Sequence, residues 1–163
     1  MPDGMCFESA TPISIGRESF HALAHELPEL WGALYRDTTG KQNLPPLEPN
    51  YDMYRKIENA GGLRVFAVRW GDTLVGVMIF FVSRNLHHAS ATWATCDTVW
   101  LQPDARKPYV AKRLIETAEE ALRQEGVHTV QIAAKTYMPS LSRLLVALGY
   151  DTPEITHQKV IVT

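Results

Sequence analysis

The chain has 163 residues, of which 45% are hydrophobic and 21% are charged, and its formal net charge is -2. This composition predicts a single globular domain over residues 1–163 and excludes a fibrous or largely disordered chain. The Lys and Arg residues are scattered, with no run of five or more like charges, so the composition disfavours nucleic acid as a partner.

The cysteines and the apolar segments indicate the cellular compartment of the protein. Cys6 lies near the N-terminus and Cys96 inside a predicted strand, a pattern typical of reduced thiols in a cytosol rather than of a disulfide framework. The first residues, MPDGMCFESATP, lack the positive region and the apolar stretch of a signal peptide. The most apolar segment, Leu74 to Val82, is about half as long as a membrane-spanning helix. We therefore expect a cytoplasmic protein with no membrane partner.

The N-terminal third predicts helices and a loop. Apolar side chains recur at helical spacing over residues 17–36, and Pro28 kinks or divides this helix. Residues 37–50, DTTGKQNLPPLEPN, are dense in Gly, Pro, Asn and Asp and predict a loop. Residues 51–62, YDMYRKIENAGG, predict a short helix that ends at the glycine pair.

The middle of the chain predicts three strands. Residues 63–70, LRVFAVRW, and 73–83, TLVGVMIFFVS, are rich in residues that favour strands, and Gly71-Asp72 between them has the composition of a tight hairpin turn. After the loop RNLHHAS, residues 91–101, ATWATCDTVWL, predict a third strand. Because strands that follow one another usually pair, we expect an antiparallel meander.

A long helix and a further strand follow. Residues 108–125 place apolar side chains on one stripe and charged side chains opposite it, which predicts an amphipathic helix capped by Gly126. Residues 127–134, VHTVQIAA, predict the next strand. The strand-helix-strand unit over residues 97–134 is expected to be a right-handed parallel crossover.

The C-terminal part predicts a second amphipathic helix and a last strand. The helix covers residues 139–148 and stops at Gly149, and the strand lies within residues 157–162. An antiparallel meander followed by a parallel crossover makes a mixed sheet. The predicted fold class is therefore mixed α+β.

The start of the predicted helix at Pro108 is electrostatically unusual. Four basic residues surround it: Arg106, Lys107, Lys112 and Arg113. Cations at a helix N-terminus oppose the helix dipole, and no Ser, Thr or Asn cap precedes Pro108, so amide donors are left free. A bound phosphate would explain both features. Alternatively, Asp104 caps the turn and the basic side chains extend into water.

The segment DTVWLQPDARKPYVAKRLIETAEEALRQEGV, residues 97–127, resembles the cofactor-binding segment of the Gcn5-related N-acetyltransferases, the GNAT family. In that family a strand runs into a Pro-x-x-Arg turn and a helix, and the sequence motif continues as Arg-x-x-Gly-x-Gly/Ala. The resemblance extends from Gly62 to the C-terminus, through GDTLVGVMIFFV and LLVALGY, and is closest to bacterial members and those carried by bacteriophages. It implies helices on both faces of the sheet and an enzyme that transfers an acetyl group from acetyl-CoA to a primary amine by direct attack.

In that family the pyrophosphate of acetyl-CoA lies on the amides of this loop, and the pantetheine pairs with the strand before it. The resemblance implies the following contacts to the cofactor: Val99, Trp100, Leu101, Arg106, Lys107, Tyr109, Val110, Ala111 and Lys112. Tyr109 replaces the first Gly of the motif, and Pro108 removes an amide donor. Two alternatives stay open: a non-catalytic binding or assembly module, and a phage-type nucleobase-modifying protein, which the acidic net charge disfavours.

Acetyl transfer needs a base, because an amine is almost fully protonated at neutral pH. Asp97 matches an acidic residue that the family often carries on this strand, and it is the predicted base; the alternative is a carboxylate that pairs with a neighbouring strand or caps a bulge. Leu145 stands where many members have the tyrosine that protonates the departing thiolate, so Tyr137 or solvent is expected to replace it. Cys96 has no evident His partner, and we expect no acyl-enzyme.

The acceptor is expected to be a small-molecule or protein amine. Trp31 and Tyr54, with Tyr51, either line the acceptor pocket or pack in the core. His87 and His88 lie in a loop before the strand of the predicted base; they are loop structure, part of the acceptor pocket or, least favoured, metal ligands. We expect no metal site, and a homodimer remains open.

Overall fold

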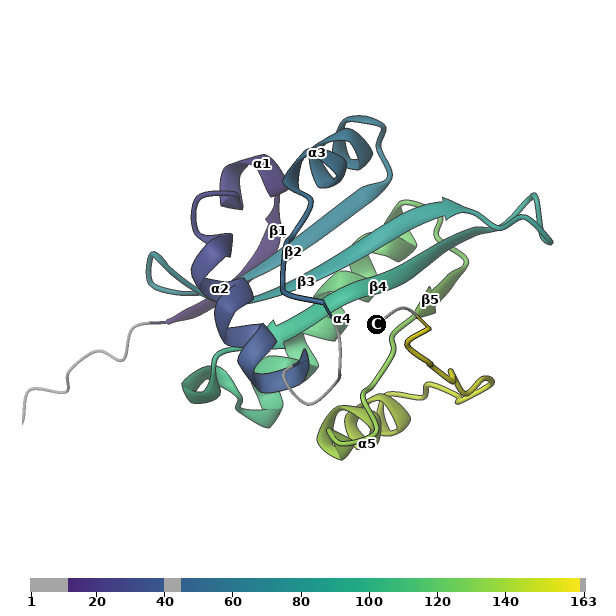
Figure 1. Cartoon of the computed structure of the whole chain (residues 1–163). Coiled ribbons are helices and arrows are strands. Elements are labelled where there is room, and N and C mark those ends of the chain that lie inside the picture. The colour runs from purple at the N-terminus through teal and green to yellow at the C-terminus, as the bar shows by residue number, and fades with distance from the viewer. Residues whose placement is uncertain (1–11, 40–44, 162–163) are drawn as a thin grey trace, which may run out of the picture.

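The structure is a computed structural model that describes residues 12–39 and 45–161 (Figure 1). Cys6 and part of the loop predicted over residues 37–50 lie outside this range. The described strands are β1 (Ile13–Glu18), β2 (Leu63–Trp70), β3 (Thr73–Arg84), β4 (Thr92–Leu101) and β5 (Thr129–Gln131). The described helices are α1 (Phe20–Leu23), α2 (Leu27–Leu34), α3 (Tyr51–Asn59), α4 (Pro108–Gln124) and α5 (Pro139–Ala147), with a π-helical turn η1 (Tyr35–Thr39) and a 3-10 turn η2 (Pro103–Ala105).

The strands form one sheet in the order β1-β2-β3-β4-β5. Strands β1 to β4 are antiparallel neighbours, and β5 pairs parallel to β4 after the α4 crossover. The predicted mixed α+β class, the antiparallel meander and the parallel crossover are thus confirmed. Gly71 has a φ of 60° in the β2–β3 turn, a conformation that glycine adopts without steric cost.

Helices cover both faces of the sheet, as the resemblance implied (Figure 1). Helix α4 buries one stripe against one face, made by Val110, Leu114, Ile115, Ala118 and Leu122, and Leu145 of α5 joins the same cluster. Helices α1 and α2 bury Phe20, Leu23, Leu27, Leu30 and Trp31 against the other face, with side chains of α3 packed at the rim. Burying each large apolar side chain contributes about 1.5–3 kcal/mol, so the two layers stabilise the sheet between them.

The N-terminal region differs from its prediction. The helix expected over residues 17–36 begins only at Phe20, because residues 13–18 form β1, which pairs with β2 from Ile13 opposite Trp70 to Glu18 opposite Val65. A turn separates α1 from α2, and Pro28 lies in the first turn of α2, where its missing amide costs nothing. The break near Pro28 was therefore predicted, whereas the strand was missed.

The last predicted strand is wrong for the residues that the structure describes. Residues 157–161 form no strand, residues 151–161 are all exposed, and only Val162 of the predicted segment lies outside the described range. The Val and Ile residues there favour a strand, but strand propensity forms no sheet without a paired backbone. Strand β5 is also shorter than its prediction, with three residues, so the sheet ends at β5.

Candidate active site

Strand β4 has an open edge in its second half. Its parallel pairing with β5 starts at Trp93 opposite Thr129 and ends at Thr95 opposite Gln131. From Cys96 to Leu101, no described strand lies against this edge, and Figure 1 shows the chain after β5 turning away toward α5. The backbone of β4 is therefore available there to pair with an extended ligand.

Asp97 lies at a β-bulge on this open stretch. In the register with β3, Ile79 is opposite Thr98 and Phe80 is opposite Cys96, so Asp97 is the extra residue of β4. A bulge changes the direction in which a side chain points. The carboxylate is exposed and meets two donors at the same oxygen: Tyr54 Oη donates to Oδ2 over 2.6 Å, and Thr98 Oγ1 donates to Oδ2 over 3.1 Å.

Tyr54 reaches Asp97 from helix α3. Its ring stacks on Phe20 at 4.7 Å between centroids and on Phe81 at 6.0 Å, and Trp31 lies at 6.3 Å. Burial and the bond to Asp97 raise the pKa of Tyr54 well above its usual value, so the hydroxyl stays neutral. Trp31 is 5% exposed and belongs to the core cluster of α1 and α2. The structure thus brings Tyr54 to Asp97 and places Trp31 in the core.

Cys96 precedes Asp97 on the opposite face of the sheet, packed against the α4 cluster. Its Sγ lies 3.4 Å from the carbonyl oxygen of Thr98. Burial raises the pKa of the Cys96 thiol far above its usual value. A neutral thiol on this face is a poor nucleophile.

Arg106 begins the predicted phosphate loop, and its side chain is already held. Its Nε donates to the carbonyl oxygen of Leu101 over 2.8 Å, its Nη2 binds Asp37, and its guanidinium lies 5.7 Å from the ring centroid of Trp100. The Trp100 indole also donates to Asp37 over 3.2 Å. The bond from Arg106, followed by the bond from Trp100, lowers the pKa of Asp37 against the effect of burial. Asp37, from the π-helical turn after α2, thus links that turn to the end of β4.

The start of α4 offers one free backbone donor in the described chain. The amide of Lys107 donates to Ala105 over 2.8 Å, and the amides of Val110 and Ala111 donate to the Lys107 carbonyl over 2.9 and 3.2 Å. Pro108 has no amide proton, so Tyr109 is left as the residue whose amide has no partner. No side chain caps this helix, and Tyr109 is 57% exposed.

Two basic residues flank Tyr109 in the sequence. Lys112 lies 3.5 Å from Glu116 on the exposed face of α4, and Lys107 is exposed. Of the other residues predicted to contact the cofactor, Trp100, Leu101 and Val110 are buried, and Val99 and Ala111 are half-buried. The amides of Val110 and Ala111 are used within α4, so a ligand is left with the backbone of Val99, Trp100 and Leu101. The sequence predicted this junction, but it did not predict Asp37, which lay in a segment interpreted as a loop.

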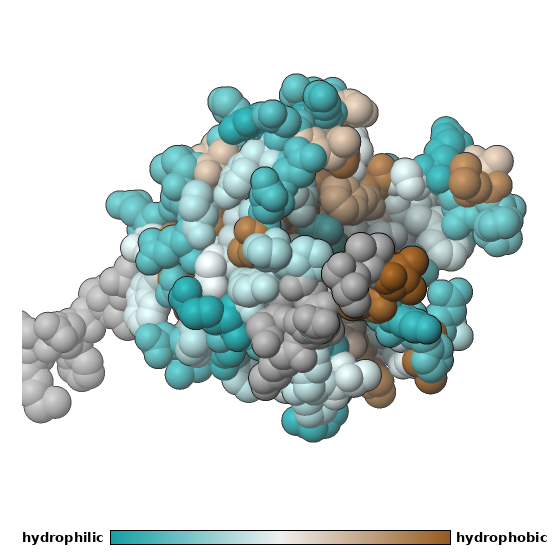
Figure 2. Space-filling view, viewed as in Figure 1, coloured by the Kyte–Doolittle hydropathy of each residue, from teal (hydrophilic) through white to brown (hydrophobic). Residues whose placement is uncertain are grey.

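The remaining predicted residues lie elsewhere. His87 and His88 are exposed in the β3–β4 loop, where their amides donate to Asn85 Oδ1. The first half of β4, from Thr92 to Asp97, separates this loop from Asp97 and spans roughly 16 Å. Figure 2 shows hydrophobic atoms at the tip of this loop, where Leu86 is 96% exposed. The structure does not bring either histidine to Asp97.

The residues considered as the general acid that protonates the departing thiolate lie at α5 and in the turn before it. Tyr137 is half-buried in the turn before α5, and Leu145 is 6% exposed against α4. Tyr150 donates to Glu119 over 2.6 Å and packs against the same core. A leucine at this buried position cannot transfer a proton, so the tyrosine acid of many family members has no counterpart at residue 145.

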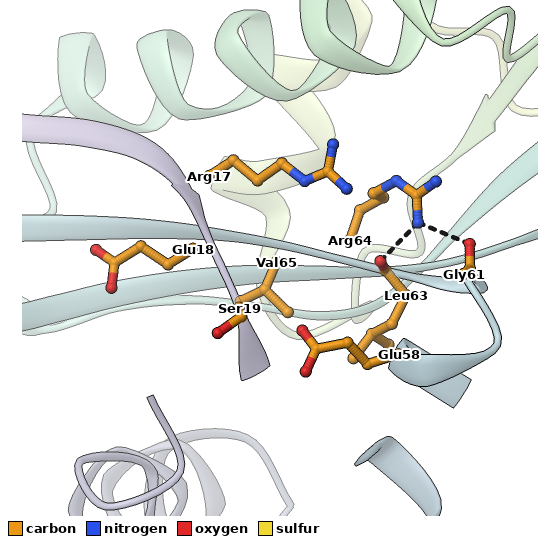
Figure 3. Close-up of a pocket in the computed structure, with 8 residues that line it drawn as sticks. All are labelled: Arg17, Glu18, Ser19, Glu58, Gly61, Leu63, Arg64 and Val65. Carbon is orange, nitrogen blue, oxygen red and sulfur yellow. Dashed lines mark hydrogen bonds between the residues drawn. The ribbon is translucent and has the colours of Figure 1, made fainter. Parts of the chain in front are cut away.

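A separate pocket lies at the edge of β1 and β2 (Figure 3). It is lined by Arg17, Glu18, Ser19, Glu58, Gly61, Leu63, Arg64 and Val65. Its charges are already used: Arg17 and Arg64 both bind Glu125 of the α4 C-terminus, over 2.6 and 2.7 Å, and Glu58 accepts the amides of Phe20 and His21. The pocket contains none of the predicted site residues, and its ion pairs fasten α4 to the sheet.

Two negative findings concern the described residues alone. They contain no group of three or more His, Cys, Asp or Glu side chains arranged to hold a metal ion. None of the helices in that part of the chain has the length and apolar character needed to cross a membrane.

The fold is similar to that of several solved proteins, including acetyltransferases. An aminoglycoside acetyltransferase from an uncultured soil metagenomic sample, in complex with sisomicin, superposes with a TM-score of 0.72 at 14% identity, covering 93% of this chain and 97% of that one. A ribosomal-protein-alanine N-acetyltransferase from Brucella melitensis gives 0.69 at 14% identity, covering 93% and 100%. A transcriptional regulator from Bacillus halodurans gives 0.74 at 18% identity, covering 92% and 100%.

At these identities the solved structures show a shared fold. No curated protein sequence matches the chain significantly. The profile of the acetyltransferase (GNAT) family matches residues 21–148, which include the bulge at Asp97, the loop at Arg106 and all of α4. The chain therefore belongs to the GNAT family of acetyltransferases.

Proposed function

We propose that the protein transfers the acetyl group of acetyl-CoA to a primary amine by direct attack of the amine. The observation that carries this proposal is the open edge of β4, which has a carboxylate, Asp97, at its bulge and a basic loop with a free amide, at Tyr109, at its end. The proposed base and the proposed cofactor contacts thus lie on β4 and on the loop and helix start that follow it.

The residues present fit acetyl-CoA. Its amide-containing arm can pair with the backbone of residues 97–101, and its phosphates can accept from the Tyr109 amide and from Lys107 and Lys112. When bound, acetyl-CoA supplies an activated acetyl thioester. The protein holds this thioester against β4, whose backbone amides are the donors available to stabilise developing negative charge on an oxygen.

Asp97 acts as the base for the amine. Its Oδ2 accepts the bonds from Tyr54 and Thr98, and within the described residues Oδ1 accepts none, so Oδ1 is the oxygen left to take a proton from an ammonium group. An exposed carboxylate also attracts a cationic acceptor. Cys96 takes no part because its thiol stays neutral.

The test measures turnover with a panel of amines and detects it by the release of the CoA thiol. We expect Asp97→Asn to lower kcat by about 10²–10⁴-fold, the usual contribution of a general base, and to leave the affinity for acetyl-CoA unchanged. Asp72→Asn, at an exposed carboxylate of the β2–β3 turn, is the matched control and should retain full activity. An unchanged rate in Asp97→Asn would remove Asp97 from the mechanism.

A second candidate is a non-catalytic binding module. The phosphate loop offers a single free amide where the family motif has glycines, and Arg106 is held by Asp37. Both features favour weak cofactor binding. Thermal denaturation separates the candidates, because a ligand that binds the folded state raises Tm by mass action. No shift at millimolar acetyl-CoA would favour the module.

A further inference from the structure

Tyr54 and Asp97 come from different layers of the fold. Tyr54 lies on α3, which covers one face of the sheet, and Asp97 lies on the bulge of β4, 43 residues later in the chain. Their 2.6 Å bond is short, and it joins a phenol to a carboxylate. It is a bridge between α3 and the open strand, at the residue proposed to be the base.

The tyrosine is held more firmly than the carboxylate. Its ring is stacked against Phe20, with an interplanar angle of 14°, and against Phe81, with an angle of 20°. The Asp97 side chain is exposed on an irregular stretch of strand, where its other bond is the longer one of 3.1 Å from the adjacent Thr98. A fixed donor beside a mobile acceptor sets the orientation of the acceptor.

We propose that Tyr54 is a positioning residue that orients the carboxylate of Asp97, rather than a residue that lines the acceptor pocket. Its hydroxyl holds Oδ2 and so turns Oδ1, the unbonded oxygen, toward the open side of β4. Tyr54 donates a hydrogen bond to Asp97 and keeps its proton during turnover, because its phenol stays neutral. This inference rests on the proposed function for its catalytic consequence but not for the contact itself.

The substitution Tyr54→Phe removes the hydroxyl and keeps the stacked ring. Tyr51→Phe is the matched control, because Tyr51 lies on the same helix and the structure places it in the core packing of α1 and α2 rather than at Asp97. Its ring also contacts Phe20, at 5.9 Å between centroids. With an amine substrate in hand, we expect Tyr54→Phe to lower kcat about tenfold, a part of the 10²–10⁴-fold contributed by a base, with KM for the amine unchanged. Tyr51→Phe should not change kcat.

Two outcomes of the kinetic test would overturn the proposal. If Tyr54→Phe raises KM and leaves kcat unchanged, Tyr54 contacts the acceptor instead. If Tyr54→Phe slows an Asp97→Asn enzyme as much as it slows the wild type, the hydroxyl acts independently of Asp97. The proposal predicts that the double variant is no slower than Asp97→Asn alone.

A second readout does not depend on activity. Three-bond NMR couplings report χ1 of Asp97, and we expect a single rotamer in the wild type and in Tyr51→Phe but averaged couplings in Tyr54→Phe. A single rotamer in all three proteins would overturn the proposal, even if the enzyme is active. Averaging in Tyr54→Phe with no turnover of any amine would support the positioning role and refute the proposed function instead.

Discussion

Replacing Gly76 by alanine is expected to destabilise the fold at the strand that carries the active site. Gly76 of β3 lies opposite Leu101 of β4. A Cβ at this position would lie 2.4 Å from Leu101 Cδ2 and 2.9 Å from the carbonyl oxygen of Trp100. The leucine methyl can rotate away, but the carbonyl belongs to the backbone of β4, so the two strands must move apart.

The expected magnitude follows from two opposing effects. Overpacking costs about 1–3 kcal/mol, and the loss of glycine's freedom in the unfolded chain returns about 0.4–1 kcal/mol, which leaves a net loss of up to about 2.6 kcal/mol. For a chain of this length, each kcal/mol lowers Tm by about 2–4 °C. Urea and thermal denaturation measure both quantities.

Gly16→Ala is the matched control for this substitution. Gly16 lies in β1, and a Cβ there would meet nothing within 4 Å. We expect this variant to be as stable as the wild type or more stable, by about 0.4–1 kcal/mol. If Gly76→Ala and Gly16→Ala have the same free energy of unfolding, the close approach of β3 and β4 is not a constraint on the fold and the reasoning fails.

Three further predictions concern charged and phenolic groups. Glu125→Ala should lower the free energy of unfolding by about 1–3 kcal/mol, because it leaves Arg17 and Arg64 without their carboxylate. Glu120→Ala, on the exposed face of α4, is the control and should have no measurable effect in the same urea titration. The pKa of Asp37 is lowered in the folded protein, so ionised Asp37 stabilises the fold above its usual pKa of 3.8, and this stabilisation is lost as pH falls through the lower folded value. The difference in free energy of unfolding between wild type and Asp37→Asn should therefore shrink in acid. A difference that stays constant with pH would contradict this prediction. The pKa values of Tyr54 and Tyr150 are raised in the folded protein, so the free energy of unfolding should fall as pH rises above 10.0. Ultraviolet difference spectra should show both phenols ionising only when the protein unfolds. Ionisation at the usual pKa in the folded protein would refute their hydrogen bonds.

The elements that were predicted correctly are those whose pattern is long and local. Helix α4 has a full apolar stripe, and β2 and β3 have long apolar runs with a glycine turn between them, so periodicity and turn chemistry were sufficient. β1 was missed because it is short and lies directly before a helix, which hid its alternation. The strand expected within residues 157–162 failed because composition does not supply a pairing partner.

The candidate site was predictable only along the strand that carries it. Asp97 and the loop from Arg106 to Ala111 are continuous in sequence and resemble the motif of one family, so they were found together. The partners of these residues, Tyr54 and Asp37, lie 43 and 69 residues away in the sequence and are brought in by the fold. No spacing rule connects residues so far apart, and their contacts became visible only once α2 and α3 were packed on the sheet.

Titration of 15N-labelled protein with acetyl-CoA tests the central claim most directly, because amide shifts show both whether the ligand binds and where. The open edge of β4 and the start of α4 predict saturable shifts concentrated in residues 97–112, with the free amide of Tyr109 among the largest. The claim would be contradicted by an unchanged spectrum at millimolar acetyl-CoA, or by saturable shifts confined to the pocket around Arg17 and Arg64.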